Sequence, residues 1–253
     1  MPTVEYRDVR KDFVTADGEQ TSALSDVSFT IRDGEFVSVL GPSGCGKSTL
    51  LEITAGLTER TGGEILLDGR PMSWPNRQIG VVFQDSSLFP WRSIRKNVEF
   101  GLQLEGVGRA ERRERAEETL KRVGLGDFLN KYPHQLSGGM RQRAGLARTL
   151  VADPSFILMD EPFSALDYLT RLQLQDEIVQ LWQRDRKTIL FVTHDVSEAV
   201  YMADRVVLLS PHPGRIRHVF DVDLPRPRER HEAHLQEIEQ QIYRLLTDPE
   251  ATV

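Results

Sequence analysis

VSVLGPSGCGKSTLLEITAG, residues 37–56, is the stretch of this sequence that decides the fold. It places Gly41, Gly46, Lys47 and Ser48 in the spacing G-x-x-x-x-G-K-S, between an apolar run with strand character and a run with helical character. Glycines let the backbone turn so that successive amide N–H groups face phosphate oxygens, and the helix that follows adds its positive N-terminal end. The stretch therefore predicts a phosphate-binding loop between a strand and a helix.

The side chains at the end of this loop suit a nucleotide bound with Mg²⁺. Lys47 supplies a mobile positive charge, the Ser48 hydroxyl is placed to ligate Mg²⁺, and Thr49 is a neighbouring donor to phosphate. Cys45 lies inside the loop, where it is either a small residue that fits or a reactive thiol. If its side chain is accessible, the helix N-terminus and Lys47 should lower its pKa.

Composition limits the class of protein. The 253 residues allow a main domain with an inserted lobe, and the 39% hydrophobic and 28% charged residues are an ordinary globular balance. No apolar run approaches the roughly 18 residues of a membrane span, and the start MPTVEYRDVRKDF lacks the apolar core of a signal peptide. We expect a cytoplasmic protein. The formal net charge of −6 disfavours nucleic acid as a partner.

Apolar β-branched runs recur along the chain with helical stretches between most of them. The runs are residues 35–40, 80–84, 155–160, 188–193 and 205–210. Because they are apolar throughout rather than alternating, they predict strands covered on both faces, as in a parallel sheet wrapped by helices. We therefore expect the α/β class.

Two earlier segments, 4–13 and 23–31, alternate apolar and polar residues and predict a small flanking antiparallel sheet. Asp17-Gly18, Asp33-Gly34 and Asp68-Gly69 are turn pairs that suit hairpins.

The charge pattern changes between Gly101 and Asn130, where arginines alternate with glutamates around few apolar positions. This predicts an exposed helical lobe, and the glutamates favour a solvated face over a nucleic-acid helix. A proline-spaced segment later gives way to helical periodicity, which predicts a terminal helix docked on the body through Leu235, Ile238, Ile242 and Leu245.

Polar residues follow three of the apolar runs. Asp160 and Glu161 end one of them, where an aspartate can serve the Mg²⁺ shell and the next carboxylate can act as general base for water. The alternative is a solvated acidic strand end before Pro162. Gln84 and His194 end two others, where an amide could reach metal and water and an imidazole could contact a γ-phosphate.

LSGGM at 136–140 and SALD at 164–167, together with the loop, ILMDEP at 157–162, Gln84 and His194, resemble the ATP-binding subunit of an ABC transporter. The similarity is closest to the nitrate, sulfonate and taurine importer branch, on LFPWRSIRKNVEFGL at 88–102, SPHPGRI at 210–216 and DLPRPRER at 223–230. Met140 stands where the family more often has glutamine.

The resemblance implies one ABC ATP-binding domain over 1–253, with a P-loop NTPase core of mainly parallel sheet, a flanking antiparallel β-subdomain and an inserted α-helical subdomain. The core would be 1–85 and 155–225, the helical signature lobe 86–154 and the C-terminal helix 226–253.

In the family, two ATPase subunits pack head to tail, so that Ser137, Gly138 and Gly139 of one would meet the γ-phosphate held by the loop of the other. A serine-capped helix that binds nothing is the alternative. Phe13 would stack on adenine or serve as a core residue. The implied ATP contacts are Phe13, Gly41, Pro42, Ser43, Gly44, Cys45, Gly46, Lys47, Ser48, Thr49, Ser137, Gly138, Gly139 and Asp167. The implied catalytic residues are Glu161, His194 and Gln84, and the implied Mg²⁺ ligands are Ser48, Gln84 and Asp160.

The implied activity is ATP hydrolysis to ADP and phosphate, which drives import of a small anion or organic solute. The implied partners are a second copy of the chain, two transmembrane permease subunits at the cytoplasmic face of the membrane and, indirectly, an extracytoplasmic binding protein. Coupling helices of the permeases would contact the helical lobe and residues 86–97, where buried packing is the alternative. The rivals are a soluble ABC ATPase acting on nucleic acid or translation, and a small-molecule kinase with a P-loop.

Overall fold

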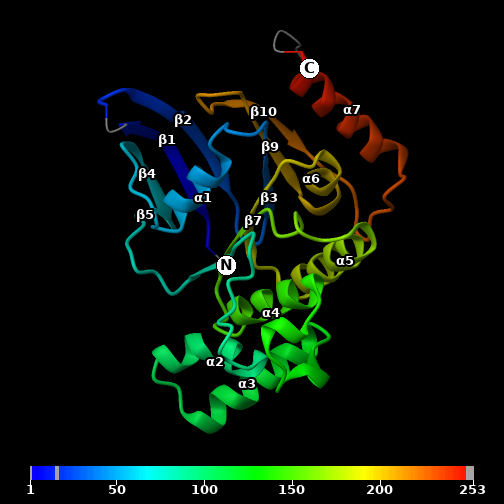
Figure 1. Cartoon of the computed structure of the whole chain (residues 1–253). Helices are drawn as coiled ribbons and strands as arrows, with labels where there is room; N and C mark the ends of the chain where they lie inside the picture. The colour runs from blue at the N-terminus through cyan, green and yellow to red at the C-terminus, as the bar shows by residue number, and fades with distance from the viewer. Residues whose placement is uncertain (1, 15–16, 249–253) are drawn as a thin grey trace. The chain divides into compact units, whose positions relative to one another are not determined.

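The computed structural model describes residues 2–14 and 17–248 (Figure 1). The chain forms two compact units. The first comprises residues 1–76 and 186–253, and the second comprises residues 77–185.

The first unit contains most of the strands. Its elements in chain order are β1 (Val4–Val14), β2 (Gln20–Ile31), β3 (Phe36–Leu40), α1 (Lys47–Thr54), β4 (Gly62–Leu67), β5 (Arg70–Pro71), β8 (Thr188–Thr193), α6 (Val196–Met202), β9 (Arg205–Leu209), β10 (Ile216–Asp221) and α7 (Ala233–Thr247).

The parallel strands are confirmed, and so is the reason for expecting them. β3 pairs in parallel with β8 on one side and β9 on the other, and β10 closes this group as an antiparallel neighbour of β9. Every residue of β3 and β8 is buried, because α1 and α6 pack against these strands. An uninterrupted apolar run therefore indicated a strand that is covered on both faces.

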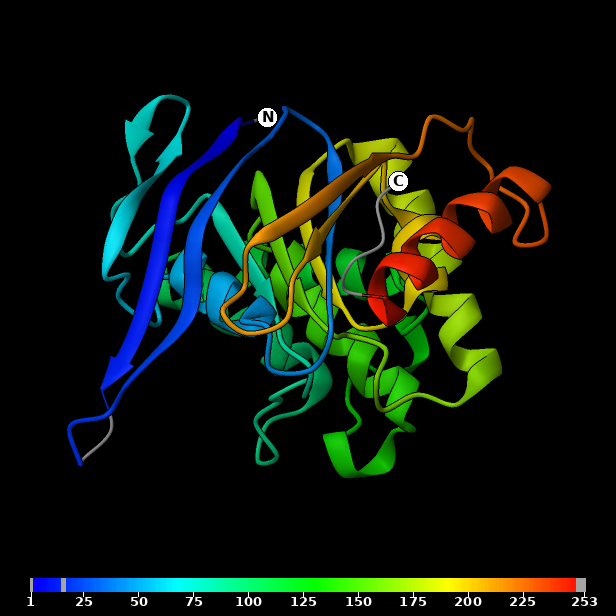
Figure 2. The same ribbon diagram turned by 90° about the horizontal axis from the view of Figure 1, so that it is seen from above.

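The antiparallel sheet is also confirmed, in the order β2-β1-β4-β5. Figure 2 shows the long β1 and β2 strands running side by side. Asp68 and Gly69 both adopt positive φ, 50° and 72°, and join β4 to β5 as the two central residues of a tight hairpin. Asp17 and Gly18 lie between β1 and β2, although residues 15–16 of that connection are outside the described part of the chain.

One hairpin prediction is wrong. Asp33-Gly34 is a turn, with Gly34 at φ 67°, but it leads from β2 in the antiparallel sheet to β3 in the parallel group. The dipeptide determines a sharp reversal of the backbone, whereas the pairing of the flanking strands depends on which surface each strand buries.

The terminal helix docks as its periodicity predicted. Leu235, Ile238, Ile242 and Leu245 are all buried, on the face of α7 that packs beside α6 (Figure 1).

The second unit is mainly helical. Its elements are β6 (Ile79–Val82), α2 (Ile94–Leu104), α3 (Arg109–Arg122), the short 3₁₀ turns Gly126–Phe128 and Pro133–Gln135, α4 (Gly138–Leu150), β7 (Phe156–Asp160) and α5 (Tyr168–Asp185). β6 and β7 pair in parallel. α2, α3 and α4 share one apolar core that includes Ile94, Val98, Ala116 and Leu120.

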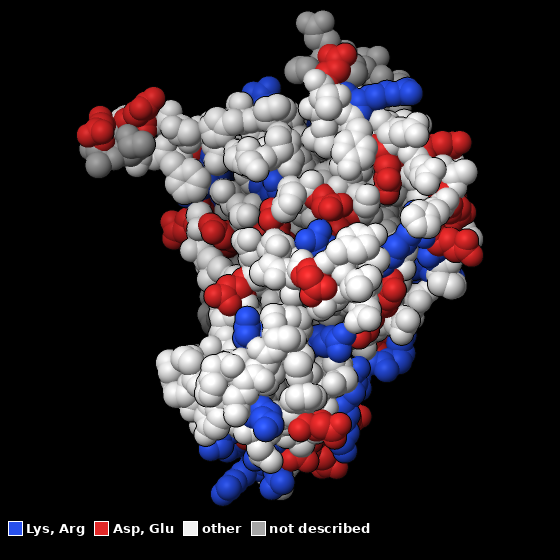
Figure 3. Space-filling view, turned by 45° about the vertical axis from the view of Figure 1, so that its right-hand side comes forward, with Lys and Arg blue, Asp and Glu red and all other residues white. Residues whose placement is uncertain are grey.

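The solvated face predicted for the charged lobe is confirmed. Along α3, ion pairs one helical turn apart join Arg113 to Glu117 and Arg115 to Glu111, and only Ala116, Thr119 and Leu120 are buried. Figure 3 shows basic and acidic side chains intermixed at the lower end of the view, where the helices of this unit lie. No helix within residues 2–14 and 17–248 is long and apolar enough to span a bilayer.

Candidate functional site

The phosphate-binding loop connects β3 to α1 in the first unit. Gly44 and Gly46 adopt φ values of 79° and 91°, a region that residues with a side chain rarely visit. A Cβ atom on Gly46 would also lie 2.7 Å from the Ala23 carbonyl oxygen. The loop therefore needs glycine at 46 for both its backbone conformation and its contact with β2.

Lys47 folds back into its own loop. Its Nζ donates to the carbonyl oxygens of Gly41 and Pro42 at 2.9 and 3.1 Å, and the residue is only 6% exposed. The ammonium thus lies within the curve of the loop, and an incoming phosphate would offer it charged acceptors in place of neutral carbonyls.

Cys45 is fully buried, so the condition for a reactive thiol is not met. Its Sγ lies 3.9 Å from Lys47 Nζ. Burial raises the pKa of the Cys45 thiol, and the attraction of Lys47 offsets that rise only in part. The lowered pKa is expected only for an accessible side chain and so does not apply here, where desolvation outweighs the nearby charge, and the alternative of a small residue that fits is the better description.

Ser48 and His194 are both exposed, at the end of the sheet where the loop begins. Parallel pairing sets Leu40 of β3 opposite Thr193 of β8, so Gly41 and His194 each follow the last paired residue of adjacent strands. The structure therefore brings the loop and His194 to one edge of the sheet.

A local network orders the backbone around His194. The Thr193 hydroxyl donates to Glu198 at 2.7 Å and accepts from the Asp195 N–H at 3.1 Å, while Asp195 accepts from the Glu198 N–H at 3.0 Å. These bonds cap the start of α6 and set the direction in which His194 leaves the strand.

Phe13 is not a core residue. Its ring is 43% exposed on β1, with Lys11 Nζ 4.7 Å from the ring centroid. Stacking on adenine stays a prediction.

In the second unit, Gln84 and Asp160 lie at one edge of a parallel strand pair. The register sets Val82 of β6 opposite Met159 of β7, so both polar residues come just after this pairing. Gln84 is exposed, and Asp160 and Glu161 are half-buried. Glu161 has φ 40°, which is uncommon for a residue with a long side chain and is the kind of backbone strain that gathers at functional sites.

Ser137 is the N-cap of α4. Its Oγ accepts from the Met140 N–H at 3.3 Å. The alternative interpretation, a serine-capped helix that binds nothing, is therefore right about the cap. A hydroxyl that accepts one bond still has its own proton to donate, and the side chain is exposed. The cap therefore leaves Ser137 able to contact an anion at the positive end of the helix.

Gly138 and Gly139 of the LSGGM segment, residues 136–140, which we call the signature, differ in what they contact. A Cβ on Gly139 would lie 2.3 Å from Thr170 Cγ2, so close packing against α5 accounts for that glycine. A Cβ on Gly138 would meet nothing nearer than 3.8 Å. No close contact within the described residues therefore requires glycine at 138, and the residue is half-buried.

Three predicted segments meet in a cavity of about 330 Å³ within this unit. Gln84 and Asp85 line it from the segment after β6, Gly138 lines it from α4, and Ala165 lines it from the SALD segment. Asp167 of that segment caps α5 by accepting from the Thr170 N–H at 3.1 Å. Hydrogen bonds from the side chain and then the backbone of Thr170 hold the pKa of the Asp167 carboxyl below its usual range.

Two side chains of α4 that the sequence did not single out hold the Gln84 segment. Gln142 donates to the Phe83 carbonyl at 3.2 Å, and Arg148 donates to the carbonyls of Ser86 and Ser87 at 2.9 and 2.7 Å. Their only sequence signal is that they follow the signature on the same helix. The signature helix and the Gln84 segment are therefore directly linked.

A family model described as ABC transporter matches residues 24–164. The chain belongs to the ABC transporter family. It is the ATP-binding, ATP-hydrolysing cassette of that family, as the resemblance of its motifs implied.

Relatives and solved structures agree with this membership. The chain is 50% identical over 231 residues, 91% of this chain and 86% of the relative, to an uncharacterized ABC transporter ATP-binding protein of Methanocaldococcus jannaschii. It is 48% identical to the taurine import ATP-binding protein TauB of Rhizobium johnstonii, over 85% of this chain and 82% of that one. A dimeric post-hydrolysis state of the ATP-binding cassette MJ0796, bound to ADP and Pi, superposes with a TM-score of 0.77 at 35% identity, covering 88% of this chain and 100% of that chain.

Proposed function

We propose that the chain drives an importer for a small anion or organic solute of the nitrate, sulfonate or taurine type. The taurine import proteins among its relatives, at about half identity, support this branch. We further propose that residues 1–253 form one cassette domain, with core, helical lobe and C-terminal helix divided as the sequence predicts.

The observation that carries the proposal is a second helix start suited to phosphate. α1 begins at the glycine loop with Lys47, whereas α4 begins at an exposed Ser137 beside Gly138, where a Cβ would meet nothing nearer than 3.8 Å. Both starts combine a hydroxyl, the backbone amides of a first helical turn and a positive helix end. Two copies arranged head to tail would let each donate Ser137, Gly138 and Gly139 to the ATP held by the loop of the other.

The chemistry proposed for each remaining side chain follows from its functional group. Glu161 orients and deprotonates the attacking water, while His194 and Gln84 hold that water and the γ-phosphate. Ser48, Gln84 and Asp160 offer hydroxyl, amide and carboxylate oxygens, a donor set that suits Mg²⁺, which would neutralise phosphate charge when bound. Phe13, Asp167 and the residues from Gly41 to Thr49 complete the proposed ATP contacts.

Permease subunits are the partners proposed for residues 86–97 and the helical lobe, at the cytoplasmic face of a membrane, with an extracytoplasmic binding protein beyond them. Trp91 supports this assignment because it is 72% exposed. Phe89 has a different role, because it packs edge-on against Phe100 with ring centroids 4.8 Å apart. An ATPase acting on nucleic acid is disfavoured by the net charge of −6.

Glu161→Gln tests the head-to-tail arrangement. The amide removes the base and keeps the shape, so we expect turnover to fall by about 10²–10⁴-fold while ATP still binds. Light scattering after size-exclusion chromatography should then show a dimer in MgATP and a monomer in MgADP.

The matched control is the double variant Glu161→Gln/Lys47→Ala, which should stay monomeric in both nucleotides because the loop loses its charge. A Glu161→Gln chain that binds MgATP and yet remains monomeric would contradict the arrangement.

A further inference from the structure

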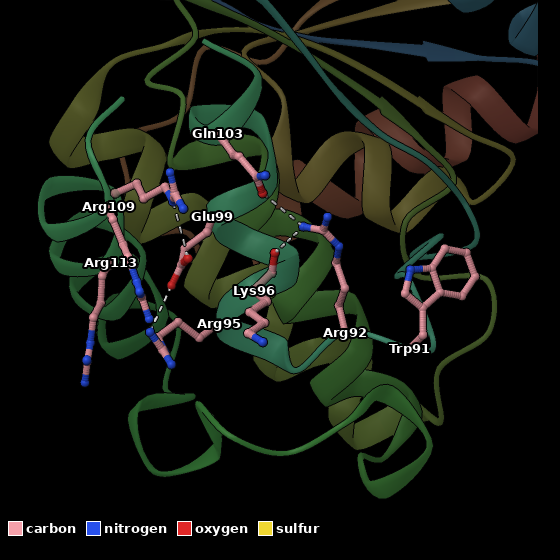
Figure 4. Close-up of a pocket in the computed structure, with 9 residues that line it drawn as sticks. Trp91, Arg92, Arg95, Lys96, Glu99, Gln103, Arg109 and Arg113 are labelled. Carbon is pink, nitrogen blue, oxygen red and sulfur yellow. Dashed lines mark hydrogen bonds and ion pairs between the residues drawn. The ribbon is translucent and has the colours of Figure 1, made fainter. Parts of the chain in front are cut away.

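A second cavity lies between α2 and α3 of the second unit and has a volume of about 460 Å³ (Figure 4). None of the proposed ATP contacts or catalytic residues lines it. Its cationic lining residues are Arg92, Arg95, Lys96, Arg109, Arg112 and Arg113, and its one lining carboxylate is Glu99. The cavity is therefore strongly basic in a chain whose net charge is −6.

Two carboxylates neutralise part of this charge. Glu99 pairs with Arg95 at 3.0 Å and lies 3.7 Å from Arg112 Nε. Glu117, beyond the lining, pairs with Arg113 at 2.8 Å and lies 3.6 Å from Arg95. Three arginines thus share two negative charges, and these pairs hold the guanidinium groups in place.

The other cations are not neutralised. Arg92 donates only to neutral acceptors, the Lys96 carbonyl at 3.5 Å and Gln103 Oε1 at 3.3 Å, and its guanidinium lies 4.8 Å from the Phe100 ring centroid. In the described part of the chain, the side chains of Lys96 and Arg109 have no hydrogen-bond or ion-pair partner. Figure 4 shows these side chains around the same hollow, Arg92 from the segment before α2, Lys96 from α2 and Arg109 from α3.

The start of α3 presents its positive dipole end, which the carboxylate of Glu111 in the first turn offsets in part. Arg109 is its first residue, and the N-cap, Gly108, has no side chain to accept a bond from the first turn. The amide dipoles of the 14-residue helix therefore point their positive end toward the Arg109 side of the cavity.

We propose that this cavity binds a polyvalent phosphate, either free or on the headgroup of an anionic phospholipid. Six cations against two carboxylates leave an excess that one monovalent anion does not offset. Guanidinium groups match phosphate oxygens in geometry, and those of Arg92 and Arg95 are already ordered by their partners. The volume is within the usual range of about 300–1,000 Å³ for small-ligand sites. The proposal does not depend on the transported solute or on dimer formation, although the cavity lies in the surface, residues 86–97 and the helical lobe, that is also proposed to contact permeases.

Pyrophosphate is the probe for the free form. Calorimetric titration of the nucleotide-free full chain, without Mg²⁺, should show binding in the wild type and also in Lys47→Ala, whose phosphate loop is impaired. Lys96→Gln/Arg109→Gln should raise the dissociation constant by about tenfold or more, since each removes a charged donor. The control Arg70→Gln/Lys131→Gln removes two exposed cations elsewhere and should leave it unchanged.

Vesicles distinguish the two sources. If the phosphate is on a lipid, phosphatidylglycerol vesicles should co-sediment the chain, phosphatidylcholine vesicles should not, and Lys96→Gln/Arg109→Gln should abolish the difference. If the phosphate is free, pyrophosphate binds and neither vesicle does. Three results would overturn the proposal. In the first, Lys96→Gln/Arg109→Gln keeps its circular dichroism spectrum and binds both probes as the wild type does. In the second, Lys47→Ala alone removes pyrophosphate binding and no vesicle binds, and in the third, neither probe binds the wild type.

Discussion

Gly214 shows how a single residue determines the position of the phosphate loop. Its N–H donates to the Ala23 carbonyl and its carbonyl accepts from the Ser25 N–H, both at 2.9 Å. A Cβ at this position would lie 2.1 Å from the Cys45 carbonyl oxygen. Only glycine lets the segment after β9 pass this close to the loop, so Gly214 is a positioning residue for ATP binding.

Gly214→Ala should therefore displace the loop. We expect it to raise the KM for ATP by about tenfold, with a smaller change in kcat, and to destabilise the fold by about 1–3 kcal/mol through overpacking. Steady-state ATPase kinetics and denaturant unfolding measure the two effects. The control Gly101→Ala adds a Cβ that meets nothing within 4 Å, and in a helix it should stabilise slightly with KM unchanged. Equal KM values for the two variants would contradict the positioning role of Gly214.

At the scale of elements, Asn97 of α2 supports the segment that presents Trp91. It is fully buried, and its Oδ1 accepts from the Phe89 N–H at 2.7 Å. Its Nδ2 donates to the carbonyls of Phe89, Arg92 and Ser93 at 3.1–3.2 Å. One side chain thus satisfies several backbone groups of a loop that has no regular structure of its own.

Asn97→Ala should cost about 2–4 kcal/mol in the free energy of unfolding, because the Phe89 N–H and the Arg92 carbonyl lose the partner that Asn97 provides and a fully buried side chain is removed. Urea denaturation followed by circular dichroism measures the loss. Asn130→Ala removes an exposed amide from the same unit and should change stability by less than about 0.5 kcal/mol. A similar small change for Asn97→Ala would show that the loop does not need these bonds.

At the scale of the whole molecule, the proposed exchange of signatures between two copies predicts complementation. Lys47→Ala and a Ser137→Arg variant should each be inactive, because every site in either homodimer lacks one half. If the two variants mix at random, half of the dimers are mixed and each of these contains one complete site. About a quarter of all ATP sites should then be complete. ATPase activity of the mixture measures this. Activity no higher than that of the separate variants would indicate that each chain completes its own site.

Part of the fold followed from local patterns. Runs such as 188–193 are apolar at every position, and a strand with no polar face has to be covered on both sides. The glycine loop is predictable for a related reason, because its backbone conformation excludes most other residues. The helical spacing of Leu235, Ile238 and Ile242 likewise indicated which face of α7 is buried.

Other features depend on neighbours that are distant in sequence. The charge at Lys47 would lower the pKa of an accessible Cys45 thiol, but contacts made by the folded chain bury the sulfur and raise its pKa. The arginines of α3 alternate with glutamates and indicate a solvated face, yet folding also places Arg109 of α3 and Lys96 of α2 in the lining of one cavity. Along the sequence of α3 the positive and negative charges balance, whereas the folded structure gathers mainly positive side chains around the cavity.

The sequence by itself determined the phosphate loop, the parallel and antiparallel strands and the family, because these depend on backbone conformation and on periodic burial. Tertiary structure alone decided the state of Cys45, the contacts that hold the Gln84 segment, the role of Gly214 and the basic cavity between α2 and α3. Desolvation, hydrogen bonding and net local charge are sums over all atoms nearby, and which atoms lie nearby is known only after the chain has folded.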